Sequence, residues 1–157
     1  MHREIIEQDE KLQRLFQQAN VLQQHKDIDD ETKSSFVSYL CIRTFGYVES
    51  SVKTILREYV RTYSQDVPTF NFVNARLINL SLRRDQIIEL IGQFDKQWSE
   101  SLKNSITIDH GDSLRAIVVN RNEIAHGGDV DMSLRDLERY FRDAQEVVSH
   151  VFDACNT

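Results

Sequence analysis

The chain has 157 residues, enough for one domain with a hydrophobic core and too few for two ordinary domains. We therefore expect residues 1–157 to form a single domain. With 5 Gly and 1 Pro, the composition favours an all-helical fold. A net charge of -6 argues against non-specific coating of nucleic acid, because such binding depends mainly on phosphate neutralisation by Lys and Arg.

The sequence predicts a cytoplasmic protein without a metal, a cofactor or a membrane segment. Cys41 and Cys155 are not part of a C-x-x-C pair or a regular His/Cys spacing, so we expect reduced thiols. The first residues are too charged for a secretory signal. No apolar run approaches the roughly 18 residues of a spanning helix.

Helical periodicity organises the first half of the chain. Apolar residues at helical spacing predict a polar amphipathic helix over about residues 3–24. Residues 27–30 supply N-cap chemistry, with Asp29 or Asp30 as the cap, for a second helix from about Glu31 to Tyr63. That helix would be roughly 45–50 Å long, so we expect it to be the central element. Its expected core stripe consists of Cys41, Phe45, Val48, Val52, Ile55, Leu56, Tyr59 and Tyr63.

The single proline, Pro68, predicts a helix boundary in the middle of the chain. Pro68 predicts a break over residues 64–71, because proline removes a backbone donor and biases its predecessor toward extended geometry. A short helical or irregular piece is expected over residues 74–82. A long helix should then cover residues 85–104, followed by a loop over residues 106–111.

Two further helices complete the predicted fold. Asp112 is the expected cap of the fourth main helix, which two glycines, Gly127 and Gly128, should end. Ser133, with Asp136 three residues later, is expected to cap the last helix. The sequence therefore predicts an all-α bundle of about five main helices around one long helix.

One charged residue falls inside the apolar stripe of the fourth helix. Helical periodicity places Arg121 between Val118 and Ile124, while Glu49 lies about 70° from the centre of the long helix's stripe. We expect Glu49 and Arg121 to pair across the helix interface, so that Glu49 orients Arg121 toward a cleft. The alternatives are a buried ion pair that only fixes helix register, or two side chains that both reach water.

The end of the same helix carries Asn122 and His126, four residues apart and therefore on one face. Arg121 and His126 are about 140° apart around an ideal helix. They can converge only if the last turn distorts at Gly127, or if their target spans both faces. A purely structural alternative is that a protonated His126 interacts with the carbonyls at the helix end.

The segment RNEIAHG, residues 121–127, resembles the R-x-x-x-x-H motif of the HEPN superfamily, and the helix order resembles a HEPN bundle. The resemblance implies a metal-independent endoribonuclease, often a toxin or host-defence effector, in which two subunits juxtapose their motifs. Arg121 would hold the scissile phosphate, Asn122 would help to position it, and His126 would transfer protons. Glu49 lies where several such nucleases carry an acidic residue on the long helix.

One departure from the family pattern narrows the choice of partner. Some HEPN toxins have a tyrosine two residues after the histidine, where a nucleotidyltransferase antitoxin modifies it, but this chain has Gly128. An antitoxin of that type is therefore not expected. Another antitoxin or regulatory protein is compatible with the sequence.

The implied chemistry suits these residue types. RNA carries its own nucleophile, the 2′-OH, so the protein needs to assist its deprotonation, protonate the leaving 5′-oxygen and stabilise charge on phosphorus. Imidazole and guanidinium suit those tasks, and the product end would be a 2′,3′-cyclic phosphate. We expect RNA binding in a local basic cleft formed by Arg115, Arg121 and Arg139. The pair Arg83-Arg84 suggests a solvated helix start that could also contact RNA phosphates.

Two other readings remain open from the sequence. The first is a non-catalytic HEPN module that binds a nucleotide, RNA or a protein partner. The second is a helical adaptor without an active site. The remaining histidines, His2, His25, His110 and His150, are scattered and are expected at the surface.

Overall fold

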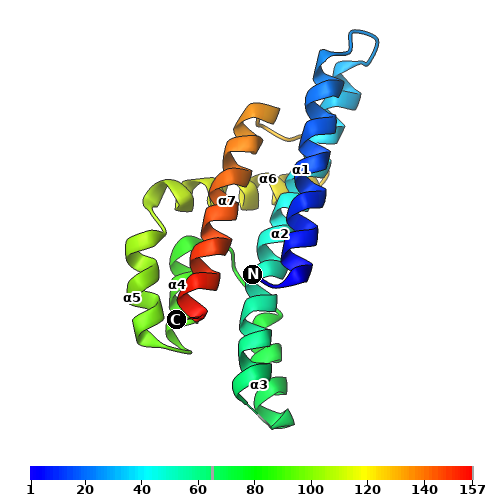
Figure 1. The fold of residues 1–157 in the computed structure, drawn as a ribbon. Coiled ribbons are helices and arrows are strands. Elements are labelled where there is room, and N and C mark those ends of the chain that lie inside the picture. The colour runs from blue at the N-terminus through cyan, green and yellow to red at the C-terminus, as the bar shows by residue number, and fades with distance from the viewer. Residues whose placement is uncertain (65, 157) are drawn as a thin grey trace.

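The computed structural model describes residues 1–64 and 66–156, and the regular secondary structure of this part of the chain is all α-helix (Figure 1). The all-α prediction is confirmed, although these residues form seven helices rather than about five. They are α1 (Arg3–Gln24), α2 (Asp30–Tyr63), α3 (Val67–Leu77), α4 (Arg84–Gly92), α5 (Lys96–Ser105), α6 (Ile108–Ala125) and α7 (Leu134–Cys155).

The long helix α2 is the central element, as predicted. Its N-cap is Asp29, whose carboxylate accepts a hydrogen bond of 2.7 Å from the Thr32 amide. It packs against α1, α3, α6 and α7. In Figure 1, α1 and α2 form an arm at the top of the view, and α3 folds back beside the other end of α2. Tyr63, expected on the core stripe, is instead 73% exposed at the end of this helix.

Pro68 helps to begin a helix instead of breaking the chain. Asp66 caps α3 by accepting a hydrogen bond of 2.8 Å from the Thr69 amide. Pro68 therefore lies in the first turn, where no intrahelical partner exists for a backbone N–H and the fixed proline φ suits the helix. The predicted break is confirmed at its start, because α2 ends at Tyr63, but it is shorter than predicted, and the helix start near Asn74 is wrong because α3 begins at Val67. Gln65 lies outside the described residues.

The helix expected over residues 85–104 is two helices, α4 and α5. Asp95 begins α5 by accepting a hydrogen bond of 2.6 Å from the Gln97 amide. Gly92 ends α4 so close to α5 that a Cβ on it would lie 3.1 Å from the Ser99 Cβ. The tight turn and the Asp95 cap explain why the apolar periodicity continues although the helix does not.

Helix α6 begins earlier than predicted. Thr107 is its N-cap, and His110 completes a reciprocal capping box, in which the Thr107 amide donates a hydrogen bond of 3.0 Å to His110 Nδ1. The expected loop over residues 106–111 and the Asp112 cap are therefore both wrong. The expected surface position of His110 is also wrong, because this side chain is buried and its Nε2 lies 3.0 Å from a Glu146 oxygen on α7. Ser133 caps α7 as predicted.

One hydrophobic core joins the helices. Leu40, Val48, Leu56, Ile117 and Leu137 are fully buried residues from three of them. Cys41 and Cys155 are buried free thiols. At the edge of the core, Trp98 of α5 meets Tyr59 of α2 edge to face, with ring centroids 4.7 Å apart.

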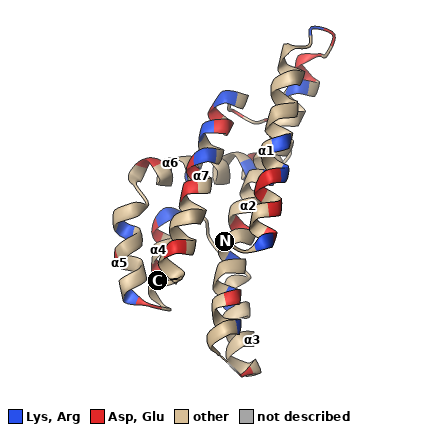
Figure 2. Cartoon of the chain, viewed as in Figure 1, with Lys and Arg blue, Asp and Glu red and all other residues tan. Residues whose placement is uncertain are grey.

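Charged residues are interspersed over the outside of the bundle. Figure 2 shows Asp and Glu distributed along α1, α2 and α7, with Lys and Arg between them. Within the described residues, no helix combines the length and apolar character of a membrane span.

Candidate functional site

The motif lies at an ordered helix end. The Gly128 amide donates a hydrogen bond of 2.8 Å to the Glu123 carbonyl, and the Gly127 amide donates one of 3.1 Å to the Ile124 carbonyl. This is the hydrogen-bond pattern of a Schellman motif, and Gly127 has the positive φ, 82°, that such a helix end requires. The glycines therefore end α6 as predicted, and they hold His126 at a defined C-cap position.

Arg121 is half-buried and packs against the long helix. Its guanidinium carbon lies 4.9 Å from the centroid of the Phe45 ring on α2. Its Nη1 donates a hydrogen bond of 3.1 Å to Asn122 Oδ1. The aromatic face and the neighbouring amide together hold the guanidinium, and no carboxylate among the described residues pairs with it.

The expected pair of Glu49 and Arg121 is not formed. Glu49 instead accepts a hydrogen bond of 2.9 Å from Lys53 Nζ, one turn further along α2. Arg121 meets α2 at Phe45, which precedes Glu49 by one turn. The prediction was wrong because periodicity gives the side of a helix that faces its neighbour but not the height at which the two helices cross.

Asn122 and His126 lie on the exposed side of α6. The His126 amide donates to the carbonyl of Asn122 at 3.1 Å, as in a regular helix end. Within the described part of the chain, the His126 imidazole has no hydrogen-bond partner. The last turn does not bend His126 toward α2, so Arg121 lies against α2 while the imidazole faces outward.

A buried asparagine orders the segment that follows the motif. Asn120 Nδ2 donates to the Ala116 carbonyl at 3.0 Å, and its Oδ1 accepts from the Asp131 amide at 3.0 Å. Sequence reasoning missed Asn120, and it placed Phe45 on the core stripe without predicting its contact with Arg121. Asn120 could have been found as a polar residue one turn after Ile117 on the apolar stripe, and Phe45 as an aromatic one turn before Glu49.

Gly128 leaves little room for a side chain. A Cβ at this position would lie 3.1 Å from the Glu123 carbonyl oxygen and 3.3 Å from Glu123 Oε2. A larger residue would therefore require Glu123 to shift. This crowding gives a physical reason for glycine where some HEPN toxins carry tyrosine.

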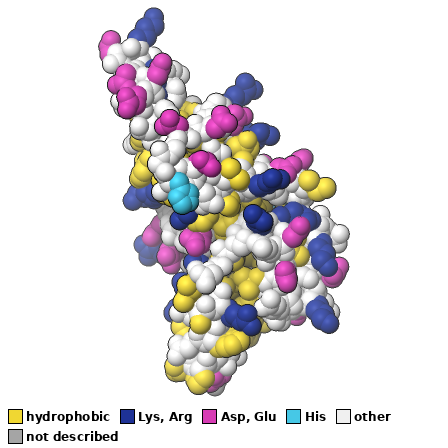
Figure 3. Space-filling model, turned by 180° about the vertical axis from the view of Figure 1, so that it is seen from behind, with side chains coloured by type: hydrophobic (Ala, Val, Ile, Leu, Met, Phe, Trp, Pro, Cys, Tyr) yellow, Lys and Arg dark blue, Asp and Glu magenta, His cyan; other side chains and the backbone are white. Residues whose placement is uncertain are grey.

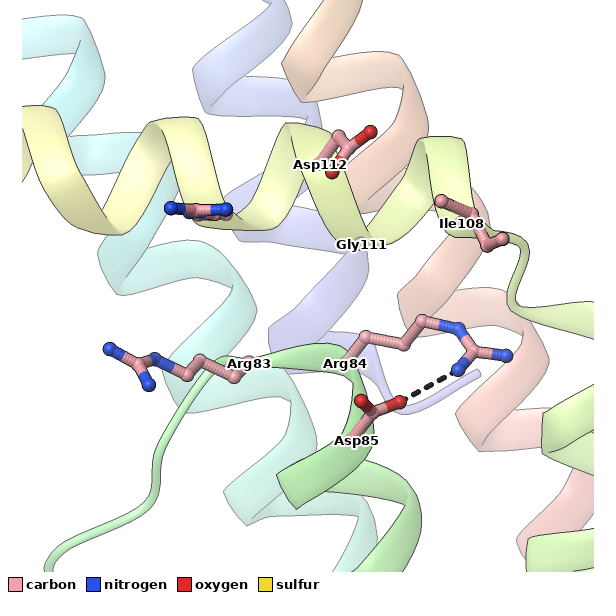
Figure 4. Close-up of a pocket in the computed structure, with 7 residues that line it drawn as sticks. Arg83, Arg84, Asp85, Ile108, Gly111 and Asp112 are labelled. Carbon is pink, nitrogen blue, oxygen red and sulfur yellow. Dashed lines mark hydrogen bonds and ion pairs between the residues drawn. The ribbon is translucent and has the colours of Figure 1, made fainter.

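The three-arginine cleft expected from the sequence has a different composition. Arg115 lines a cavity of about 490 Å³ together with Arg83 and Arg84 at the start of α4 (Figure 4). Arg139 lines another cavity, between α6 and α7, and contacts Asp136 at 3.9 Å. Arg121 lines neither of these two cavities.

Carboxylates, thiols and imidazoles do not gather elsewhere into a metal centre. Within residues 1–64 and 66–156, no group of three or more His, Cys, Asp or Glu side chains is placed to hold a metal ion. The histidine outside the motif with the most contacts is His110. Because its Nδ1 accepts from the Thr107 amide, its Nε2 carries the proton and donates to Glu146.

Comparison with known proteins identifies the family. A family model described as RiboL-PSP-HEPN matches residues 3–157, nearly the whole chain. Comparison with curated proteins gives no match, and comparison with solved structures gives none either. The family match agrees with the helical fold and with the motif at the end of α6, so the chain belongs to the RiboL-PSP-HEPN family of the HEPN superfamily.

Proposed function

We propose that this single HEPN domain is a metal-independent endoribonuclease of toxin or host-defence type, acting as a homodimer. HEPN domains are generally associated with ribonucleases and toxins. The observation that carries the proposal is the arrangement at the end of α6. Arg121 is fixed over Phe45 and bonded to Asn122, while His126 is exposed. The motif thus offers an oriented cation and an accessible proton carrier without a competing carboxylate.

The reaction follows from the chemistry of RNA. The 2′-oxygen attacks the adjacent phosphorus as its proton passes to a base, and the bond from phosphorus to the 5′-oxygen breaks as that oxygen gains a proton. Arg121 binds the non-bridging oxygens and stabilises their added charge, and Asn122 holds the guanidinium in place. His126 transfers protons. The products are a 2′,3′-cyclic phosphate and a 5′-hydroxyl.

Two proton transfers favour a site built from two subunits. Each chain has one motif imidazole, His126, whereas the reaction needs one base and one acid. A second copy would supply the other imidazole. A strip of α2 beside Phe45 suits this contact, because Tyr39 is 41% exposed and Ile42 is 43% exposed. Gly46, on the same helix face, has nothing within 4 Å of an added Cβ, so another chain could approach closely there.

Glu49 has a positioning part in this proposal. It does not reach Arg121, but it neutralises Lys53 on the helix face beyond Phe45. That ion pair would keep Lys53 from competing with Arg121 for the substrate phosphate. Its contribution should therefore be much smaller than that of Arg121.

The decisive experiment is RNA cleavage in EDTA. Wild type, Arg121→Ala and His126→Ala would be incubated with mixed single-stranded RNAs, with Arg14→Ala and His25→Ala as controls of matching residue type on exposed parts of the α1–α2 arm. Wild type and both controls should leave 2′,3′-cyclic phosphate ends, and the two motif variants should not. Cleavage that survives in His126→Ala would contradict the proposal. If wild type binds RNA without cleaving it, the chain is a non-catalytic HEPN module.

The dimer has its own test. Ile42→Asp should shift the sedimentation coefficient toward that of the monomer and reduce cleavage together with it. The matched control is Ile6→Asp, because Ile6 on α1 is also 43% exposed. A wild type that sediments as a monomer at concentrations where it cleaves RNA would rule out a composite site.

A further inference from the structure

A cavity of about 490 Å³ lies between the start of α4 and helix α6 (Figure 4). Arg83, Arg84 and Arg115 line it, together with Asp85 and Asp112. The motif chemistry described above uses none of these residues. Their contacts show which of the charges are already satisfied inside the protein.

All three nitrogens of the Arg84 guanidinium donate hydrogen bonds within the protein. Its Nε donates to the Ile106 carbonyl at 2.6 Å, its Nη2 to the Lys103 carbonyl at 3.1 Å, and its Nη1 to Asp85 at 2.7 Å. It therefore ties the start of α4 to the end of α5. Gly111 permits this packing, because a Cβ there would lie 3.0 Å from the Arg84 Cδ.

Arg83 and Arg115 are the available charges of the cavity. Both are exposed, and within the described residues neither guanidinium has a hydrogen-bond or ion-pair partner. Figure 4 shows Arg83 extending away from Arg84, whose partner is Asp85, and Asp112 projecting from the side of α6 that faces away from α4. Two guanidinium groups without an ion-pair partner among the described residues therefore border this cavity, which three arginines and two aspartates line.

The cavity and the motif share one exposed face of α6. On an ideal helix, Gly111, Arg115, Asn122 and His126 fall within a sector of about 60°. Between the cavity and the motif, Val119 on the same side is 49% exposed. Figure 3, seen from behind, shows Lys and Arg side chains across the middle of the molecule, on the side of α4 and α5. An RNA strand bound at the motif could therefore continue along this face of α6 to the cavity.

We propose that Arg83 and Arg115 form a second phosphate site, which binds the backbone of a single-stranded RNA beyond the cleavage point. Arg115 and His126 are eleven residues apart, or about 16 Å along the helix. A positively charged groove that follows the backbone binds single strands with little dependence on sequence. The site would make the enzyme prefer RNA that extends several nucleotides from the cut. The inference rests on the proposed function in taking RNA as the ligand.

The primary test measures RNA binding separately from cleavage. A fluorescein-labelled mixed-sequence 12-nucleotide RNA would be titrated at several KCl concentrations against His126→Ala, with and without Arg83→Gln and Arg115→Gln. Loss of two phosphate contacts should reduce the slope of log affinity against log salt by about 1.4. A slope that equals that of His126→Ala alone would overturn the second phosphate site.

A charge-matched control excludes a general electrostatic effect. Lys26→Gln with Lys33→Gln removes the same net charge from the turn between α1 and α2 and the start of α2, on the arm at the top of Figure 1. This control should leave the salt slope unchanged. If it lowers the slope as much as the arginine pair does, the binding is non-specific and the inference fails.

Cleavage by the active enzyme gives the second readout. In the wild-type background, the Arg83→Gln and Arg115→Gln pair should raise KM for the 12-nucleotide RNA and leave kcat within about twofold, because the scissile phosphate is held elsewhere. A fall in kcat as large as the rise in KM would overturn the assignment of these two arginines to a second phosphate site. If the wild type cleaves no RNA but the salt slope still depends on the two arginines, the proposed nuclease activity fails and the phosphate site stands.

Discussion

The guanidinium carbon of Arg121 lies 4.9 Å from the centroid of the Phe45 ring, so the cation of the motif rests on an aromatic face and not on a carboxylate. This difference matters for the phosphate-binding role that we propose for Arg121. A carboxylate partner would neutralise the guanidinium and would have to be displaced or outcompeted, whereas a ring quadrupole orients the cation and leaves its charge available.

Replacing the ring should therefore impair cleavage more than folding. Phe45→Leu keeps an apolar side chain but removes the aromatic face, which contributes about 1 kcal/mol to such a contact. We expect kcat/KM to fall about fivefold. The matched control is Phe70→Leu, which removes a ring beneath Arg61 on another part of the molecule. Equal cleavage by both variants would show that Phe45 does not orient Arg121.

Glu49→Gln should have a small effect, because Glu49 contacts Lys53 rather than Arg121. We expect cleavage to fall by less than about threefold, corresponding to a fraction of 1 kcal/mol for a partly exposed ion pair. Arg121→Ala, measured in parallel, should abolish detectable cleavage. A loss in Glu49→Gln as deep as in Arg121→Ala would mean that Glu49 acts directly on the substrate.

Gly127→Ala should destabilise the protein, because Gly127 has a φ of 82°. An L-residue in this conformation costs about 1–2 kcal/mol, which urea denaturation would measure as a lower midpoint. Gly46→Ala, measured at concentrations at which the protein is a monomer, is the opposite control, since Gly46 lies inside α2 with open space around it. That change should stabilise the helix by about 0.5–1 kcal/mol. An unchanged urea midpoint in Gly127→Ala would argue against a positive φ at residue 127.

Asn120→Ala should loosen the segment between α6 and α7. It removes the acceptor of the Asp131 amide and a buried donor to the Ala116 carbonyl, at a cost of about 1–3 kcal/mol. Hydrogen exchange at the Asp131 amide should accelerate. Asn104→Ala removes the same kind of bond, to the Glu100 carbonyl, at an exposed position and should change stability by less than about 0.5 kcal/mol. Unaltered protection at Asp131 would contradict this role.

The buried thiol of Cys41 should make the fold sensitive to alkali. Burial raises the pKa of Cys41 from 9.0 to about 11, so this thiol favours the folded state fully below pH 9.0 and progressively less as the pH rises to about 11. The free energy of unfolding should fall over that range, and by less in Cys41→Ala. Equal falls in the two proteins would show that the thiol does not contribute.

Some features that depend on local chemistry could be predicted from the sequence. Ser133 and one of the pair Asp29 and Asp30 were predicted as caps because a short acceptor before an amphipathic run satisfies exposed amides, and the structure selects Asp29. The helix end at Gly127 and Gly128 was predicted for a similar reason. Pro68 was misread because proline both breaks helices and starts them, and only the Asp66 cap distinguishes the two.

Features that depend on how the helices cross could not be predicted from the sequence. Periodicity indicated that Arg121 faces α2, which is correct, but it could not choose between Glu49 and Phe45, one turn apart. Likewise Arg83, Arg84 and Arg115 share a cavity because Gly111 lets α4 approach α6 closely. That approach joins residues distant in sequence and leaves no periodic signal.

The edge-to-face contact of Trp98 with Tyr59 turns one part of the fold into an optical reporter. Trp98 is the single tryptophan of the sequence. Fluorescence excited at the red edge of the absorption band therefore comes from α5, at the point where it meets α2. Arg84 binds the other end of α5 through the Lys103 carbonyl. A change in that fluorescence would therefore report the packing of α4 and α5 against the long helix. Circular dichroism would report the total helix content instead. Refolding experiments that record both signals would time the assembly of the arginine cavity relative to the rest of the bundle.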